Sequence, residues 1–116
     1  MTIPASETVI LVTRNGMGAG DQALQHKLLL KYLTLLVESG ILTAAICLYA
    51  DGVKLAVSGS PVLEGLHDLE QKGVRIILCS TCLEHYNLAD QVLVGVVGSM
   101  ADIIEAQFRA EKVISI

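Results

Sequence analysis

A chain of 116 residues is long enough to form one domain, residues 1–116, with a hydrophobic core that needs neither disulfide bonds nor a structural metal ion. The composition is 53% hydrophobic and 17% charged, and a net charge of −4 with one Phe and no Trp argues against nucleic acid as a partner. The longest uncharged stretches are well short of the roughly 20 apolar residues that cross a bilayer, so no membrane segment is expected.

The first half of the chain is predicted to be strand, helix, strand. The β-branched run 8–13 is typical of a strand buried on both faces. After a glycine-rich loop, Asp21 is a good N-cap for a helix that ends near Ser39, with Gly40 as its terminating residue. The apolar positions that recur at helical spacing in this segment are Leu24, Leu28, Tyr32, Leu35 and Leu36.

A second buried strand is expected over 42–48 and is followed by an Asp-Gly turn at 51–52. A short helical piece over 53–57 comes next. Ser60 and Pro61 then predict the N-cap and the first residue of a helix that Gly73 ends.

The last third of the chain is predicted to hold three more strands, over 74–78, 92–97 and 112–116. Between the first two, residues 79–86 form a turn that passes into a short helix, which Asn87 terminates. Ser99 opens the last helix, with Asp102 completing an acidic variant of the capping box.

This alternation of strands and helices predicts an α/β fold with three layers, in which helices cover both faces of a mostly parallel five-stranded sheet. Ligands and reactive groups gather beyond the carboxyl ends of the strands in such sheets. We therefore expect the functional site in the loops that follow residues 13, 48 and 78.

The location and assembly of the protein follow from its termini and its apolar content. The N-terminus has no basic region followed by an apolar core, so it does not indicate a secretory signal, and a cytoplasmic protein is expected. The excess of apolar residues predicts a homo-oligomer, because monomers seldom expose large apolar patches.

Cys79 and Cys82 form a C-x-x-C pair directly after the third predicted strand. A thiol at the start of a helix meets unpaired amides and partial positive charge, which favour the thiolate. We therefore expect Cys79 to be a partly exposed nucleophile and Cys82 a neighbour that resolves or protects it. Cys47 lies inside the second predicted strand and is expected in the core.

Three interpretations of the pair stay open. It is a thioredoxin-like dithiol, although such pairs usually follow an early strand; or it is part of a zinc site, for which His85 supplies only a third ligand; or Cys79 carries sulfur. With three ligands at most, no metal is expected. His85 and Tyr86 are candidates to donate hydrogen bonds to, or to orient, an incoming group.

The loop after the first strand carries glycines in the spacing G-x-G-x-G. It lacks the third glycine of a dinucleotide-binding fingerprint and the Gly-Lys-Ser/Thr of a P-loop, so no cofactor is expected. Its backbone amides could bind a small anion or a persulfide, and the candidate binding residues there are Asn15, Gly16, Gly18 and Gly20.

Several long motifs resemble the C-terminal domain of YedF-type proteins of the DsrE/DsrF/TusD-like superfamily. They are the segment 52–63, the segment 69–74, the C-x-T-C-L stretch that starts at Cys79, and the closing segment 110–115. The resemblance implies a flavodoxin-like α/β/α fold, assembly into trimers or hexamers, and a part in sulfur relay or selenium metabolism.

In relay members of this superfamily a cysteine just after a central strand accepts sulfur as a persulfide, and Cys79 holds the matching position. YedF-type proteins usually carry an N-terminal TusA-like domain that this sequence does not contain, so the implied sulfur donor is a separate TusA-like sulfur-carrier protein. The leading hypothesis is a sulfur carrier or sulfurtransferase. The alternative is a non-catalytic oligomeric module of DsrE-like fold that binds a small molecule or a protein.

Overall fold

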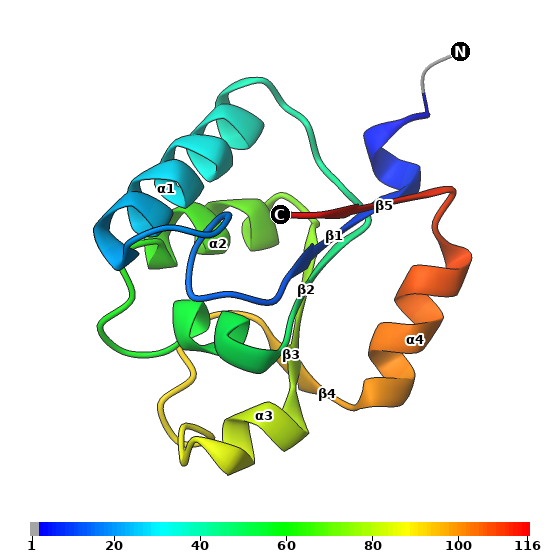
Figure 1. The fold of residues 1–116 in the computed structure, drawn as a ribbon. Coiled ribbons are helices and arrows are strands. Elements are labelled where there is room, and N and C mark those ends of the chain that lie inside the picture. Colours follow the sequence, from blue (N-terminus) through cyan, green and yellow to red (C-terminus); the bar gives the residue numbers. More distant parts are fainter. Residues whose placement is uncertain (1–2) are drawn as a thin grey trace.

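The computed structural model describes residues 3–116 and contains a five-stranded sheet with helices packed against it (Figure 1). Its strands are β1 (Thr8–Val12), β2 (Ala45–Leu48), β3 (Arg75–Cys79), β4 (Val96–Gly98) and β5 (Lys112–Ser115). Their order across the sheet is β4-β3-β2-β1-β5, and all neighbouring pairs are parallel. The predicted α/β fold with a parallel sheet is confirmed.

The path of the chain explains the layers. From β1 the strands step one by one toward the β4 edge, and right-handed crossovers place α1 (Gln22–Glu38) and α2 (Leu63–Gln71) together on one face. The last crossover returns from β4 to the opposite edge and places α4 (Met100–Arg109) on the other face (Figure 1).

Three shorter helices complete the fold. The 3-10 helix η1 (Ala5–Glu7) precedes β1, the 3-10 helix η2 (Ala50–Ala56) follows β2, and α3 (Ser80–His85) follows β3 directly. Both η2 and α3 therefore begin where a strand ends, at the carboxyl edge of the sheet. This edge is where the sequence predicts the functional site.

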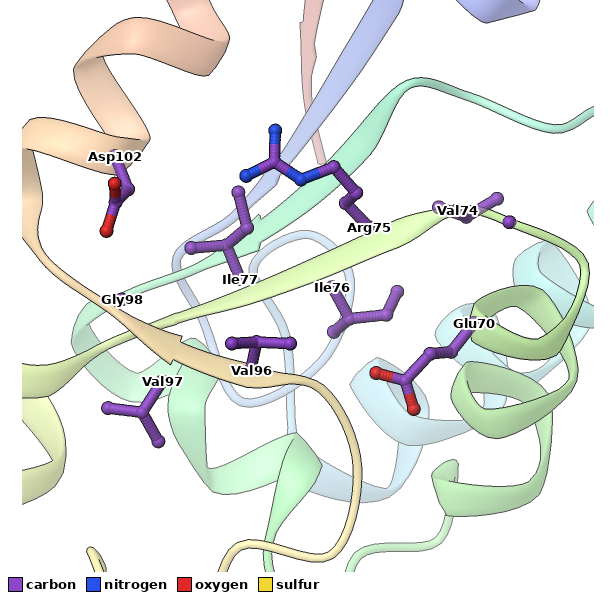
Figure 2. A pocket seen from close by; sticks show the side chains of 10 residues that line it. Glu70, Val74, Arg75, Ile76, Ile77, Val96, Val97, Gly98 and Asp102 are labelled. Atoms are coloured by element: carbon purple, nitrogen blue, oxygen red, sulfur yellow. The ribbon is translucent and has the colours of Figure 1, made fainter.

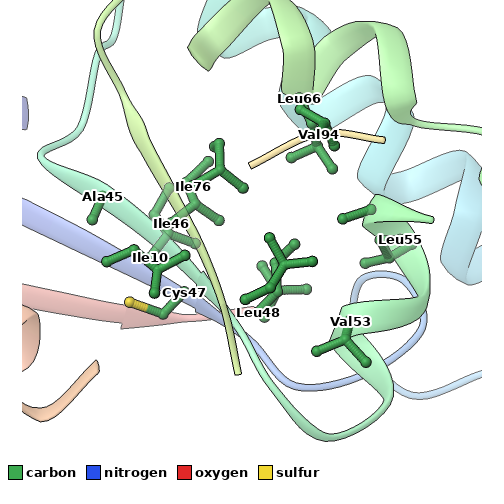
Figure 3. Packing of buried hydrophobic residues seen from close by; sticks show 14 of the residues in the cluster. Ile10, Ala45, Ile46, Cys47, Leu48, Val53, Leu55, Leu66, Ile76 and Val94 are labelled. Atoms are coloured by element: carbon green, nitrogen blue, oxygen red, sulfur yellow. The ribbon is translucent and has the colours of Figure 1, made fainter. Parts of the chain in front are cut away.

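The core lies on both sides of the sheet because side chains alternate along each strand. Toward α1 and α2, strand residues such as Ile46, Leu48 and Ile76 are at most 1% exposed. Figure 3 shows Leu48 on the same side as Val53 of η2, and Cys47 pointing the other way. Cys47 is completely buried, as its place in the second strand predicts.

Several helix boundaries match their predicted signals. The Asp21 side chain accepts a hydrogen bond of 3.1 Å from the amide of Leu24, and Gly40 ends this part of the chain with a φ of +64°. Ser99 and Asp102 form the predicted capping box, in which each side chain binds the other residue's amide. The left-handed φ of +56° at Asn87 follows the end of α3.

The predicted face of the first helix is wrong for Leu24, Leu28 and Leu35, although Leu36 is buried as predicted. The helix buries Leu29, Leu33 and Leu36, whereas Leu24 is 46% exposed and Leu35 is 52% exposed. Leucines occupy both faces of this helix at helical spacing, so the pattern alone could not decide which face meets the sheet.

Two further boundaries differ from prediction. The Ser60 hydroxyl accepts from the amide of Val62 at 3.2 Å in a local turn, so α2 begins only at Leu63, with Val62 and not Ser60 as its N-cap. The fourth strand begins at Val96 because Gly95, with a φ of +87°, redirects the chain, and residue 92 pairs outside the main sheet.

Candidate functional site at the carboxyl edge

The two cysteines of the C-x-x-C pair differ in accessibility. Cys79 ends β3, where it pairs with Gly98 of β4, and its side chain is 0% exposed. Cys82 lies one turn into α3 and is partly exposed. The prediction of a partly exposed Cys79 is wrong, because the residue still belongs to an inner strand of the sheet. Solvent reaches Cys82 instead.

Cys82 meets a backbone donor from a different part of the chain. The amide of Ala50, the first residue of η2, donates a hydrogen bond of 3.1 Å to Sγ of Cys82. Burial raises the pKa of the Cys82 thiol, the Ala50 amide acts to lower it, and the neighbouring Cys79 thiol raises it again. The net pKa is raised, so the free thiol is mostly protonated at neutral pH.

The turn that presents the Ala50 amide is held on several sides. Ala50 has a φ of +51°, a left-handed conformation that costs a non-glycine residue energy. The amide of Tyr49 donates to the carbonyl of Val12 at 3.2 Å, and that of Gly52 donates to the carbonyl of Tyr49 at 2.9 Å. A Cβ at Gly52 would overlap the Val12 carbonyl oxygen, so this turn packs directly on the end of β1.

Asp51 links the same turn to α3. The hydroxyl of Tyr86 donates a hydrogen bond of 2.6 Å to Oδ1 of Asp51, and Nζ of Lys54 lies 3.1 Å from the same oxygen. Lys54 also lies 4.3 Å from the centroid of the Tyr86 ring. The hydrogen bond from Tyr86 is the largest cause that lowers the pKa of the Asp51 carboxyl, and the contact with Lys54 lowers it further. Asp51 in turn raises the pKa of Tyr86.

Tyr86 also lies one helical turn from Cys82, because its amide donates to the Cys82 carbonyl at 3.1 Å. The Asp51 contacts therefore join the two segments whose meeting brings Ala50 to Cys82. The hydroxyl of Tyr86 donates to Asp51, and its role in orienting an incoming group stays a prediction. His85 is exposed and stacks edge-on against Tyr86, with ring centroids 5.2 Å apart.

A cavity of about 340 Å³ opens next to this network. It is formed by the loop after β1, the start of α1, η2, the 57–61 segment and the chain that follows α3. Asn15 lines it, as do Lys54 and Tyr86. The three loops in which the sequence predicts the site thus meet here.

The glycines of the loop after β1 have a structural explanation. Gly16 is buried against Gln25 of α1 with a φ of +144°, and the side-chain amide of Gln25 donates to the carbonyl of Gly18 at 2.8 Å. Neither they nor Gly20 lines the cavity, to which this loop contributes Asn15. Anion binding by these glycine amides stays a prediction.

Sequence reasoning missed Ala50, Asp51, Lys54 and His26 as members of the site. The Asp-Gly pair at 51–52 has a sufficient explanation as a turn, and an alanine carries no chemical signal. Only the packing of η2 against α3 reveals what Ala50, Asp51 and Lys54 contact, and only the folding of the loop after β1 onto α1 brings His26 to Asn15.

A larger cavity, of about 450 Å³, lies elsewhere, along the edge formed by β3 and β4 (Figure 2). Its lining begins at the amino end of β3, and Figure 2 shows Arg75 and Asp102 on one side of that strand with Glu70 on the other. Within the described part of the chain, no cysteine lines either cavity, but Tyr86, one helical turn from Cys82, lines the smaller one, whereas no residue of η2 or α3 lines the larger one. We therefore place the candidate chemistry at the smaller cavity.

Among residues 3–116, no group of three or more His, Cys, Asp or Glu side chains is placed to hold a metal ion. In the same part of the chain, no helix is both long and apolar enough to span a membrane.

The sequence matches the model of the DsrE/DsrF-like family over residues 7–116. The chain belongs to this family. Among solved structures, the ychN protein from E. coli is similar, with a TM-score of 0.68 and 17% identity over 95% of this chain and 99% of that one. No curated protein sequence matches the chain.

Two proteins of unknown function have the same fold. MTH1491 from Methanobacterium thermoautotrophicum has a TM-score of 0.68 and 20% identity, covering 94% of this chain and 97% of its own. BT1422 from Bacteroides thetaiotaomicron has a TM-score of 0.67 and 20% identity, covering 100% of both chains. At such identities the likeness establishes the fold of this DsrE-like chain.

Proposed function

We propose that this DsrE-like protein is a sulfur carrier or sulfurtransferase that holds sulfur as a persulfide on its C-x-x-C pair. One observation carries the proposal: the Cys82 thiol is partly exposed at the carboxyl edge of the sheet and accepts a hydrogen bond from the Ala50 amide. The motif resemblance to YedF-type proteins supports it, and extends it to selenium as a heavier analogue of the carried atom.

Transfer of sulfur from a donor persulfide to Cys82 requires no external oxidant. The thiolate fraction of Cys82, which is small at neutral pH because the pKa is raised, attacks the outer sulfur of a donor persulfide. The sulfur–sulfur bond of the donor breaks, and the donor leaves as a thiolate that takes up a proton. Cys82 then bears the persulfide, and the Ala50 amide donates to its inner sulfur, Sγ. An acceptor thiolate attacks the outer sulfur in the same way and regenerates Cys82.

Cys79, buried beside Cys82, has a separate role in the proposal. Its thiol attacks the inner sulfur of the Cys82 persulfide, a Cys79–Cys82 disulfide forms, and hydrogen sulfide leaves. This step unloads the carrier when no acceptor is present. It also accounts for a second thiol that solvent cannot reach in the resting protein.

The proposal includes two partners, a sulfur donor, which the resemblance to YedF-type proteins implies, and further copies of the chain. The donor is a TusA-like sulfur-carrier protein, which delivers its persulfide at the mouth of the site. The chain itself forms a homo-oligomer, because α4 exposes an apolar stripe on the side opposite its buried residues. We call this stripe the α4 patch, and it consists of Met100, Ile104 and Phe108.

The test is intact-mass analysis of the reduced protein after incubation with glutathione persulfide. We expect the mass of one added sulfur atom in the wild type and in Cys47→Ser, which serves as the matched control. The adduct should be absent in Cys82→Ser and present, with slower loss, in Cys79→Ser. An adduct that survives Cys82→Ser but not Cys79→Ser would overturn the assignment of Cys82, and no adduct in any protein would overturn the function.

A further inference from the structure

The cavity beside Lys54 has two polar walls that come from distant parts of the chain. On one wall, Oδ1 of Asn15 lies 3.4 Å from Nε2 of His26, and Nδ2 of Asn15 donates to Gln22 at 3.2 Å. On the other wall, Asp51 and Tyr86 hold Lys54. Both walls are therefore ordered by contacts within the protein, which lowers the entropy cost of binding a ligand between them.

The residues that line the cavity favour an anionic ligand. Lys54 is the only lysine or arginine that lines the cavity, and no Asp or Glu does so in the described residues 3–116. An ammonium group has three donors, and the contact with Asp51 uses one of them. Lys54 thus keeps donors for a second anionic partner, although the chain as a whole carries a net charge of −4.

The rest of the lining supplies an apolar surface and a size limit. Val57, Pro61 and Leu88 contribute apolar atoms, next to the hydroxyl-bearing turn around Gly59. The volume of about 340 Å³ is near the lower end of the roughly 300–1,000 Å³ of small-molecule sites. A ligand with a short apolar stem and one anionic group matches this arrangement.

We propose that this cavity is a binding site for a small organic acid, whose carboxylate pairs with Lys54 and whose apolar stem lies against Val57 and Leu88. The site does not depend on the proposed sulfur chemistry, because neither Cys79 nor Cys82 lines the cavity. It gives the protein a metabolite-binding function of its own.

The experiment titrates the full chain with propanoate, 4-methylpentanoate and N-acetyl-leucine, each beside its neutral primary amide, and follows backbone amide signals by NMR. We expect the two larger carboxylates to shift signals around Asn15, Lys54 and Gly59. Each neutral amide should bind about tenfold more weakly, the equivalent of one charge-assisted contact.

Two variants test the walls separately. Lys54→Met keeps the side-chain stem and removes the charge, and Asn15→Asp places a negative charge on the opposite wall without touching Lys54. Both should weaken carboxylate binding about tenfold and leave amide binding unchanged. Lys72→Met, an exposed lysine at the end of α2, is the matched control and should bind like the wild type.

The proposal is overturned if no carboxylate shifts these signals, if acids and amides bind equally, or if the shifts lie elsewhere on the protein. Cys82→Ser should bind the acids like the wild type. This separates the outcome from that of the persulfide assay, since binding without persulfide formation contradicts only the sulfur-carrier function.

Discussion

The amide of Ala50 donates a hydrogen bond of 3.1 Å to Sγ of Cys82, although the two residues are 32 positions apart in the chain. Ala50 follows β2 and Cys82 follows β3, so neighbouring parallel strands bring them to the same edge of the sheet. Ala50 has a left-handed backbone at this point, with a φ of +51°. The hydrogen-bond donor of the accessible thiol in this DsrE-like protein thus comes from a segment that is distant in the sequence.

Ala50→Gly should stabilise the protein by about 0.5–1 kcal/mol, because glycine adopts the left-handed conformation without the steric cost that alanine pays. The amide is retained, so the reactivity of Cys82 should stay close to that of the wild type. Urea unfolding measures the first effect and thiol alkylation the second. A clear loss of stability would contradict the strained conformation.

Gly52→Ala should destabilise the protein by about 1–3 kcal/mol, because the new methyl group overlaps the carbonyl oxygen of Val12 and backbone must move. Gly20→Ala is a suitable control: its methyl would meet only the side chain of Leu24, at 3.4 Å. The two midpoints of urea unfolding are compared directly. Equal midpoints would show that the turn does not pack on β1.

Iodoacetamide should label Cys82 well before Cys79 and Cys47, both of which are 0% exposed. Because the pKa of Cys82 is raised, chiefly by burial, its labelling rate should keep rising as the pH increases beyond neutral. Peptide mass spectrometry over a range of pH gives the rate for each thiol. Faster labelling of Cys79 than of Cys82 in the native protein would refute this order.

Acid stability should depend on Asp51. Its pKa in the folded protein is lowered, first by the Tyr86 hydroxyl, below the unfolded value of about 3.9. The folded state therefore binds fewer protons, so this contribution to stability is complete above the unfolded pKa and is lost as the pH falls through the folded pKa.

Asp51→Asn should accordingly flatten the fall of stability in this acidic range, as measured by thermal unfolding at a series of pH values. Asp90→Asn, at an exposed position of the loop after α3, is the matched control and should leave the profile unchanged. An identical profile for both variants would show that the contact between Tyr86 and Asp51 is not maintained in solution.

Phe108→Asp should reduce the molar mass of the protein in light scattering, because Phe108 is 85% exposed in the isolated chain and forms part of the α4 patch. A charge at that position opposes burial between subunits. Gln71→Asp, at the exposed end of α2, should leave the assembly intact. A wild-type protein that is monomeric at all concentrations would contradict the proposed oligomer.

Much of the architecture could be read from local signals, because the physics behind them is local. The β-branched run that became β1, the Asp21 cap and the capping box at Ser99 each depend on residues within one turn or one strand. The alternation of these elements then limits the fold to a parallel sheet with helices on both faces. The C-x-x-C pair likewise marked the edge of the sheet at which the candidate site lies.

Tertiary packing decided what the pattern left ambiguous. α1 carries leucines on two faces, and only contact with the sheet selected Leu29 and Leu33 for the core. In the same way, the pairing of Cys79 with β4 buried the thiol that sequence reasoning expects to be accessible. Whether a side chain is buried depends on which segments pack against it. The sequence of one strand alone does not specify those segments.

The sequence by itself therefore determined the elements, the fold class and the family resemblance, because short-range hydrogen bonding and hydrophobic periodicity set them. The tertiary structure alone decided that Cys82 and not Cys79 meets solvent, that the Ala50 amide contacts its sulfur, and that Asp51 and Lys54 contact Tyr86. Those contacts join segments more than 30 positions apart, as the separations of 32 and 35 between their hydrogen-bonded residues show. Their geometry exists only once β2 and β3 have paired.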